Sequence, residues 1–414
     1  MLLKKMMVYG FMTLYLYTLA FGVFMTTTLK IPAPLVFGLP LLLFTYKQVP
    51  SFTYYRETGM LAFGLLLFYV IGTGDNLSFV AYLITIVTCA LYFNYFVGFN
   101  KRRFTVSIII FFLLLLLSMV IMVLDHSYQS IIDPLRSRML DDRIKQSPSG
   151  LAATQFTFGY QIAAFTTFAV VATFVFNRHF FIKTLVLCIC LVFIYLGMNR
   201  SAFVSFSLAL TVFLLAYYRF KAVFFIVAVL AVGFGIYTYF LKNNLDDKNN
   251  ILSKNQAKEA NDFNRAGMAV ENLKVYADYP YGLIFYGKNW EDATYRNPAF
   301  PFGLSSHNAY LMFLTYLGPF LCIGLLAAIY YRIIRLSREI ISHIRLKHNT
   351  ILACLLFSFI SVSFNALSHN GWLLTADGPT LFLYFSLMQG AKIYSLPPKN
   401  VFVENVAELV NAVC

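Results

Sequence analysis

The chain has 414 residues, of which 59% are hydrophobic and only 12% are charged, and its formal net charge is +14 at pH 7. Its mean hydropathy is +0.70, whereas soluble globular proteins are about 45–50% apolar and about 25% charged. A water-soluble fold cannot bury this much apolar surface, so the composition excludes soluble, fibrous and disordered proteins and predicts a polytopic membrane protein. The apolar runs are continuous rather than alternating, which argues against a β-barrel.

Apolar segments near the length that crosses a bilayer core, about 20 residues, predict twelve membrane-spanning helices in a single domain over residues 1–396. They occupy residues 6–27, 31–46, 58–73, 77–98, 104–124, 150–176, 180–198, 201–218, 222–241, 308–331, 350–367 and 379–396. The first segment is too long for a cleaved signal peptide, so we expect an anchor. A short tail, residues 397–414, follows the last segment.

The positions of lysine and arginine orient these helices. With the basic N-terminus in the cytoplasm, the basic segments 101–103 and 332–347 also lie inside, and both termini are cytoplasmic. Two long loops, 125–149 and 242–307, then lie on the outer side. Loop 242–307, between the ninth and tenth spans, holds eight basic and eight acidic residues, so the net charge of +14 belongs mainly to the cytoplasmic side. That charge does not imply a nucleic-acid partner.

Cysteine and acidic residues predict neither a disulfide framework nor a metal site. The six cysteines lie in apolar segments or at the C-terminus, and we interpret them as packing residues. Cys188 and Cys190 would point to different faces of one helix. The acidic pairs Asp141-Asp142 and Asp246-Asp247 stand among flexible charged residues, which is typical of solvated surface.

Three residues at or beyond the outer face are candidates for chemistry. Arg200 stands in GMNRSAF, in a tight turn on the outer side, where the positive-inside rule disfavours basic residues. The alternative is an interfacial arginine that reaches lipid headgroups. Arg265 begins the amphipathic stretch of the large loop, where a solvated arginine is the alternative. His307, in SSHNAYL, could act as an acid or base, although a lone interfacial histidine is more often structural. Two arginines offer the forked donors that match a diphosphate.

These segments, together with the span count and the large loop, resemble the O-antigen ligase/polymerase superfamily. The matching segments are MNRSAF around Arg200, RAGMAVENLKVYADYPYG from Arg265 to Gly282, and SHNAYLMFLTYLG from Ser306 to Gly318. Detail at the level of motifs extends only from about residue 197 to 320. After Gly318 the chain continues Pro-Phe-Leu, where ligases often have another small or hydroxyl residue.

The resemblance implies a GT-C-like fold in a bacterial inner membrane and metal-independent, inverting glycosyl transfer on the periplasmic face, without a cofactor. Arg200 and Arg265 would hold the diphosphate of an undecaprenyl diphosphate-linked glycan donor and stabilise the charge that develops on it. His307 would orient or deprotonate the acceptor hydroxyl. Candidate substrate contacts are Asn308, Tyr279, Tyr281, Tyr286 and His369. Bilayer lipids and a chain-length regulator are further expected partners.

Two reactions fit this resemblance, and they differ in the acceptor. A polymerase, which we favour, uses a second lipid-linked glycan, whereas a ligase uses lipid A core. A lipid-linked oligosaccharide flippase or transporter is an alternative of another class, but such folds have internal repeats and intramembrane charges that we do not find here. His369 and Asp377 could join the outer cavity, or they could form a polar turn with Trp372 at the membrane interface.

Overall fold

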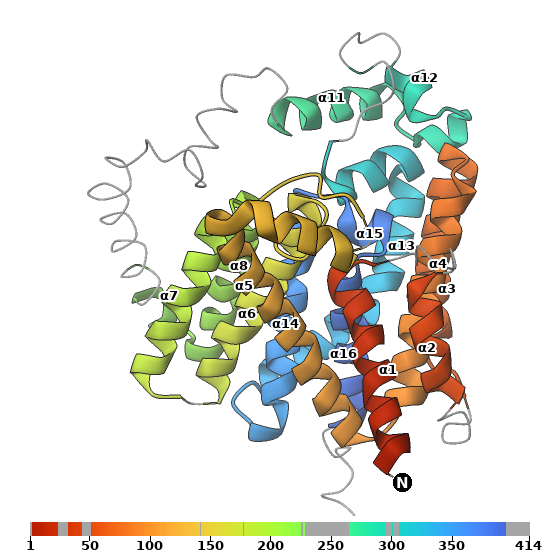
Figure 1. Ribbon diagram of the computed structural model, residues 1–414. Coiled ribbons are helices and arrows are strands. Elements are labelled where there is room, and N and C mark those ends of the chain that lie inside the picture. Colours follow the sequence, from red (N-terminus) through yellow and green to blue (C-terminus); the bar gives the residue numbers. More distant parts are fainter. Residues whose placement is uncertain are drawn as a thin grey trace, which may run out of the picture.

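The computed structural model describes residues 2–23, 32–43, 51–140, 142–176, 178–224, 227, 265–294, 300 and 306–394. These residues form helices and no strand, and the long helices pack side by side, with the short helices α11 and α12 across one end (Figure 1). The elements are α1 (Leu2–Phe21), α2 (Ala33–Leu43), α3 (Tyr55–Leu65), η2 (Leu66–Thr73), α4 (Asn76–Leu91), η3 (Tyr92–Val97), α5 (Lys101–Leu140), α6 (Gln155–Val175), α7 (Phe180–Leu196), α8 (Arg200–Tyr218), α11 (Arg265–Asp278), η5 (Leu283–Tyr286), α12 (Trp290–Thr294), α13 (Ala309–Ser342), η6 (Lys347–Asn349), α14 (Thr350–Asn365), α15 (Gly371–Thr375) and α16 (Gly378–Ile393).

The helices have the length and composition of a membrane protein. Six helical segments of the described part are long and apolar enough to cross a bilayer: Asn76–Val97, Lys101–Leu140, Gln155–Val175, Arg200–Tyr218, Ala309–Ser342 and Lys347–Asn365. The predicted all-α membrane protein is therefore confirmed. Eleven of the twelve predicted spans coincide with described helices, whereas most of the ninth, 222–241, lies outside the described residues. The count of twelve and the outer loop 242–307 stay predictions.

Burial separates an inner layer of helices from an outer one. Helix α14 packs against α6, α8 and α16, and α16 buries every residue from Gly378 to Gly390. A helix that is apolar on all sides is buried in this way in a large helical protein. Helix α7, by contrast, exposes large apolar side chains such as Phe180, Phe181 and Val192. Such an exposed apolar surface fits contact with lipid rather than with water.

The predicted loop 125–149 is helical up to Leu140, because α5 continues beyond a non-helical residue at Tyr128 (φ −132°, ψ 38°). Arg136, which is fully buried, connects this extension to the segment that follows. Its guanidinium donates hydrogen bonds to Asp125 (2.9 Å), Asp133 (2.7 Å), Ser147 (2.8 Å), Ser149 and the Ala152 carbonyl (3.2 Å). The turn after α5 is thereby held against the helix.

Candidate active site

A cavity of about 260 Å³ opens at the end of the bundle where α6, α13 and α16 begin. In Figure 1 this is the upper end, on which α11 and α12 also lie. Five parts of the chain contribute to its lining, and the residues are Gly22, Tyr82, Phe156, Thr157, Tyr160, His307, His369, Asn370, Gly371, Thr375, Asp377 and Gly378. The cavity thus contains two histidines and one carboxyl, beside aromatic and hydroxyl groups.

Among the helices that begin around this cavity, α6, α8, α13 and α16 each begin with a side-chain cap, whereas the short helix α15 does not. The capping oxygens accept from first-turn amides as follows: Thr154 from Thr157, Asn199 from Ala202, Asn308 from Leu311, and Asp377 from Thr380. Such caps satisfy amides that have no partner inside the helix. Because helix N-termini carry partial positive charge, their convergence favours an anion in this region.

The residue before the cap has a left-handed conformation in three of these turns. The φ values are 50° at Met198, 51° at His307 and 46° at Ala376. Positive φ is uncommon outside glycine and costs of order 1–3 kcal/mol, and such residues gather at functional sites. The two predicted segments around Arg200 and His307 therefore share one local geometry, a strained residue followed by a capping asparagine.

Phe156, near the start of α6, brings the two predicted histidines together. Its ring lies 5.0 Å from that of His307, nearly stacked at 23°, and 5.1 Å from that of His369. The sequence proposed His307 for acid–base chemistry and His369 as a substrate contact, and both line the same cavity. Nothing in the sequence around Phe156 indicates this position between them.

A short hydrogen bond connects His369 to the start of α8. His369 is buried, and its Nε2 lies 2.6 Å from the Ser201 hydroxyl oxygen. That hydroxyl donates to the Asn199 side chain at 2.7 Å. A serine hydroxyl has one proton, so His369 Nε2 is the donor in the contact with Ser201. The histidine loop is thereby fixed beside Arg200, the first residue of α8.

Asp377 is a site residue that the sequence analysis left as an alternative. Its side chain lines the cavity and is buried. Burial raises the pKa of the Asp377 carboxyl to about 7, although the Thr380 hydroxyl (2.6 Å) and amide (3.0 Å) donate to it and favour the carboxylate. A carboxyl with a pKa of about 7, in a cavity that two imidazoles also line, is suited to moving protons. The sequence alone does not indicate that Asp377 is buried.

The two arginines proposed for the diphosphate are each the first residue of a helix. Arg200 is half-buried and follows the Asn199 cap, next to Ser201, but it is not among the cavity-lining residues. Arg265 begins α11, and its side chain lies outside the described residues. Their joint contact with a diphosphate stays a prediction.

The other predicted substrate contacts are not among the residues that line the cavity. Tyr279, Tyr281 and Tyr286 pack on one another in the turn after α11, with ring centroids 5.3 Å apart for Tyr279 and Tyr286 and 6.5 Å apart for Tyr281 and Tyr286. Asn308 caps α13 through its side chain. The structure therefore gives Asn308 a role in the backbone turn, and sugar contact by these four residues stays a prediction.

The segment 265–294, which we call the cap, touches α13 at a pair of glycines. A Cβ atom added to Gly282 would lie 2.2 Å from the Gly318 nitrogen, and one added to Gly318 would lie 1.8 Å from the Tyr281 carbonyl oxygen. Gly318 interrupts α13 with φ 75° and ψ 172°, a region that essentially only glycine occupies. The segment from His307 to Gly318 therefore reaches from the cavity to the contact with residues 281–282.

A buried asparagine makes the second connection between the cap and α13. Asn272 of α11 is fully buried; its amide donates to the Ser306 hydroxyl at 3.1 Å, and its carbonyl oxygen accepts from the Thr315 hydroxyl. Ser306 directly precedes His307. The cap, which begins at Arg265, is therefore tied to the segment that carries the predicted base.

The described residues contain no further group that could bind a metal ion. In the residues that the structure covers, no group of three or more His, Cys, Asp and Glu side chains could hold a metal ion. The five cysteines in that part are free: Cys188 is exposed, and Cys89, Cys190, Cys322 and Cys354 are buried.

No protein-family model matches the chain, and a search of curated proteins finds no match.

Proposed function

We propose that this protein is a membrane glycosyltransferase that moves a glycan from an undecaprenyl diphosphate carrier to a hydroxyl of an acceptor glycan. The observation that carries this proposal is the cavity at one end of a membrane bundle, in which His307 and His369 share the space with the buried carboxyl of Asp377. A cavity at the bundle end suits a substrate whose polyprenyl tail stays in the bilayer while its head group reacts. The motifs around Arg200, Arg265 and His307 supply the second line of support.

In the proposed reaction, the acceptor oxygen attacks the anomeric carbon of the donor sugar. The bond from that carbon to the diphosphate oxygen breaks, the new glycosidic bond forms on the opposite side, and the hydroxyl proton passes to His307. General base catalysis of this kind contributes about 10²- to 10⁴-fold. The departing diphosphate gains negative charge, which Arg200 and the surrounding helix N-termini would stabilise.

His369 and Asp377 would support this reaction rather than perform its central step. The hydrogen bond of His369 to Ser201 fixes the start of α8, and therefore the backbone of Arg200, relative to the cavity. The near-neutral pKa of Asp377, about 7, allows its carboxyl to exchange a proton with a neighbouring group at working pH. We favour a polymerase, in which the acceptor is a second lipid-linked glycan, and keep the ligase as the alternative.

Purified protein in proteoliposomes, given a defined undecaprenyl diphosphate-linked repeat unit with or without lipid A core, tests the proposal by gel analysis of products. A ladder from the lipid-linked unit alone identifies a polymerase, and transfer that requires core identifies a ligase. Movement of the glycolipid across the membrane without any product would instead support a flippase.

The variant His307→Ala should lower product formation by about 10²- to 10⁴-fold. His343→Ala is the matched control, because His343 is exposed and lies at the far end of α13. Equal activity in the two variants would contradict the role given to His307.

A further inference from the structure

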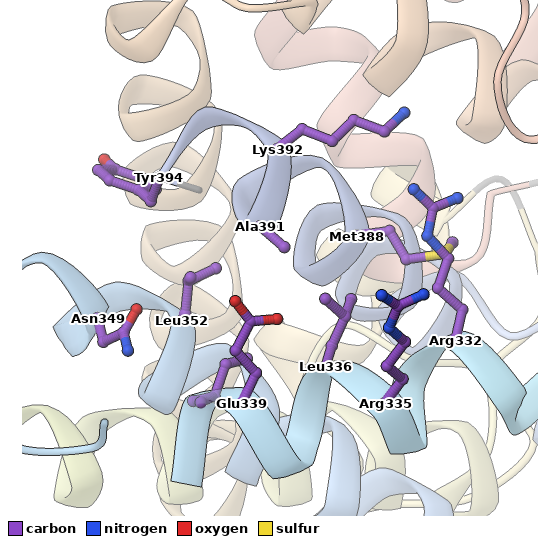
Figure 2. A pocket seen from close by; sticks show the side chains of 11 residues that line it. Arg332, Arg335, Leu336, Glu339, Asn349, Leu352, Met388, Ala391, Lys392 and Tyr394 are labelled. Atoms are coloured by element: carbon purple, nitrogen blue, oxygen red, sulfur yellow. The ribbon is translucent and has the colours of Figure 1, made fainter. Parts of the chain in front are cut away.

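A second cavity, of about 300 Å³, lies at the other end of α13 and α16 from the candidate active site. Gly378, the first residue of α16, lines the first cavity, whereas Lys392, near the last residue, lines the second. A helix of this length spans about 24 Å, so the two cavities are separate. Figure 2 shows Arg335 and Glu339 reaching from α13 toward α16.

The second cavity has a surplus of positive charge. Its charged lining residues are Arg332, Arg335, Lys392 and Glu339. With Glu57, which pairs with Arg332, three cations stand against two carboxylates, and the difference is +1. Arg335 and Glu339 are four residues apart on α13 and therefore lie on one face of the helix. Both are exposed, and within the described residues Arg335 makes no ion pair.

The other two cations are held in place by the first turn of α3 and by the two residues before it. Arg332 pairs with Glu57 at 3.2 Å. Lys392 donates a hydrogen bond to the Thr53 hydroxyl, and its Nζ lies 4.1 Å from the centre of the Tyr54 ring. Fixed cations of this kind lose little conformational freedom when they bind an anion, so the cavity is preorganised for a negatively charged group.

The remainder of the lining is largely apolar. Leu336 of α13, Leu352 of α14 and Met388 of α16 stand beside the charged groups. The cavity therefore combines cations with an apolar wall at the end of membrane-spanning helices. An amphiphilic anion, with a phosphate beside an acyl chain, matches both parts, because guanidinium groups bind phosphate oxygens through paired donors.

We propose that this cavity binds the headgroup of an anionic phospholipid, with the phosphodiester on Arg335, Arg332 and Lys392 and an acyl chain along Leu336 and Met388. Basic pockets between membrane helices are suited to such headgroups. The Glu339 carboxylate accepts a hydrogen bond from a headgroup hydroxyl, as in the glycerol of phosphatidylglycerol. The inference is independent of the function proposed for the first cavity.

The test uses the purified full-length chain, delipidated in detergent and titrated with phosphatidylglycerol, phosphatidylcholine or inorganic phosphate. We expect native mass spectrometry to retain one phosphatidylglycerol per chain, and the melting temperature to rise with this lipid but not with phosphatidylcholine. A free phosphate ion should give no comparable rise, because it lacks the acyl chain. An equal rise with inorganic phosphate or with phosphatidylcholine would overturn the lipid assignment.

Two variants and a matched control locate the site. Arg335→Gln should weaken phosphatidylglycerol binding about tenfold, since one charge-assisted contact is lost. Arg338→Gln removes the same charge from an exposed position three residues along the helix that does not line the cavity, and it should bind as the wild type does. Glu339→Gln keeps a side-chain oxygen that accepts the hydrogen bond of the headgroup hydroxyl and removes the charge that repels the phosphodiester, so it should strengthen binding. Equal losses in Arg335→Gln and Arg338→Gln, or weaker binding by Glu339→Gln, would overturn the proposal.

Discussion

Replacement of Gly318 by alanine is expected to displace the cap from α13 while the helix bundle stays folded. The added Cβ would lie 1.8 Å from the Tyr281 carbonyl oxygen, whereas real Cβ contacts essentially never fall below 3.0 Å. The two backbones must therefore separate by at least the difference, 1.2 Å. Alanine at φ 75° and ψ 172° would add strain of about 1–3 kcal/mol.

The easiest relief of this clash is movement of the turn 279–287, because its side chains are largely exposed while α13 is packed between α3 and α16. Since the cap is also tied to Ser306 through Asn272, its displacement would disturb the segment that carries His307. A misplacement of about 1 Å can lower the rate of a positioned reaction about 100-fold. We therefore expect about a 100-fold loss of polymer formation by a protein that still elutes as a single species.

Hydrogen–deuterium exchange supplies a readout that does not depend on the function. The amides of Gly282 and Lys288 bond to Tyr279 and Leu283 within the turn, and they should exchange faster in Gly318→Ala than in the wild type. The matched control is Gly324→Ala in the same helix, where an added Cβ meets nothing within 4 Å. Wild-type exchange and activity in Gly318→Ala, or an equal loss in Gly324→Ala, would refute the reasoning.

Three further predictions address the charged groups. Arg200→Lys should fail in polymer formation if a forked contact to diphosphate matters; full activity of Arg200→Lys would show that only the positive charge at this position matters. Asp377 has a folded-state pKa of about 7, above the unfolded value of about 3.9, so the wild type should lose stability as pH rises from about 4 to about 7, by up to about 1.4 kcal/mol per pH unit. Asp377→Asn should lack this slope in thermal unfolding, and an unchanged slope would assign it to other groups. Arg136→Met should cost about 3–5 kcal/mol of unfolding free energy, because it leaves the buried Asp125 unpaired; Asp125→Asn in the same background should restore part of that loss.

The sequence by itself predicts the class of protein and part of the site. Apolar segments in lipid must satisfy their backbone hydrogen bonds internally, so composition and segment length lead directly to an all-α membrane protein. Asn199 and Asn308 cap their helices through local chemistry, and the sequence proposes His307 because it lies next to Asn308 at the start of a span. Segment length and helix capping depend on residues that are adjacent along the chain, so they can be predicted from the sequence.

Tertiary structure alone decides which residues share the cavity. Tyr160 and His369 are 209 positions apart, and Ser201 and His369 are 168 apart, yet hydrogen bonds join both pairs. The sequence leaves Asp377 either in the outer cavity or in a polar turn; its burial, and with it the raised pKa, comes from helices elsewhere in the chain. Burial and pKa depend on the whole surrounding volume, because desolvation is set by every atom that replaces water. The N-cap residue of each helix depends on the local sequence, whereas only the packing of the helices brings these N-cap residues to one end of the bundle.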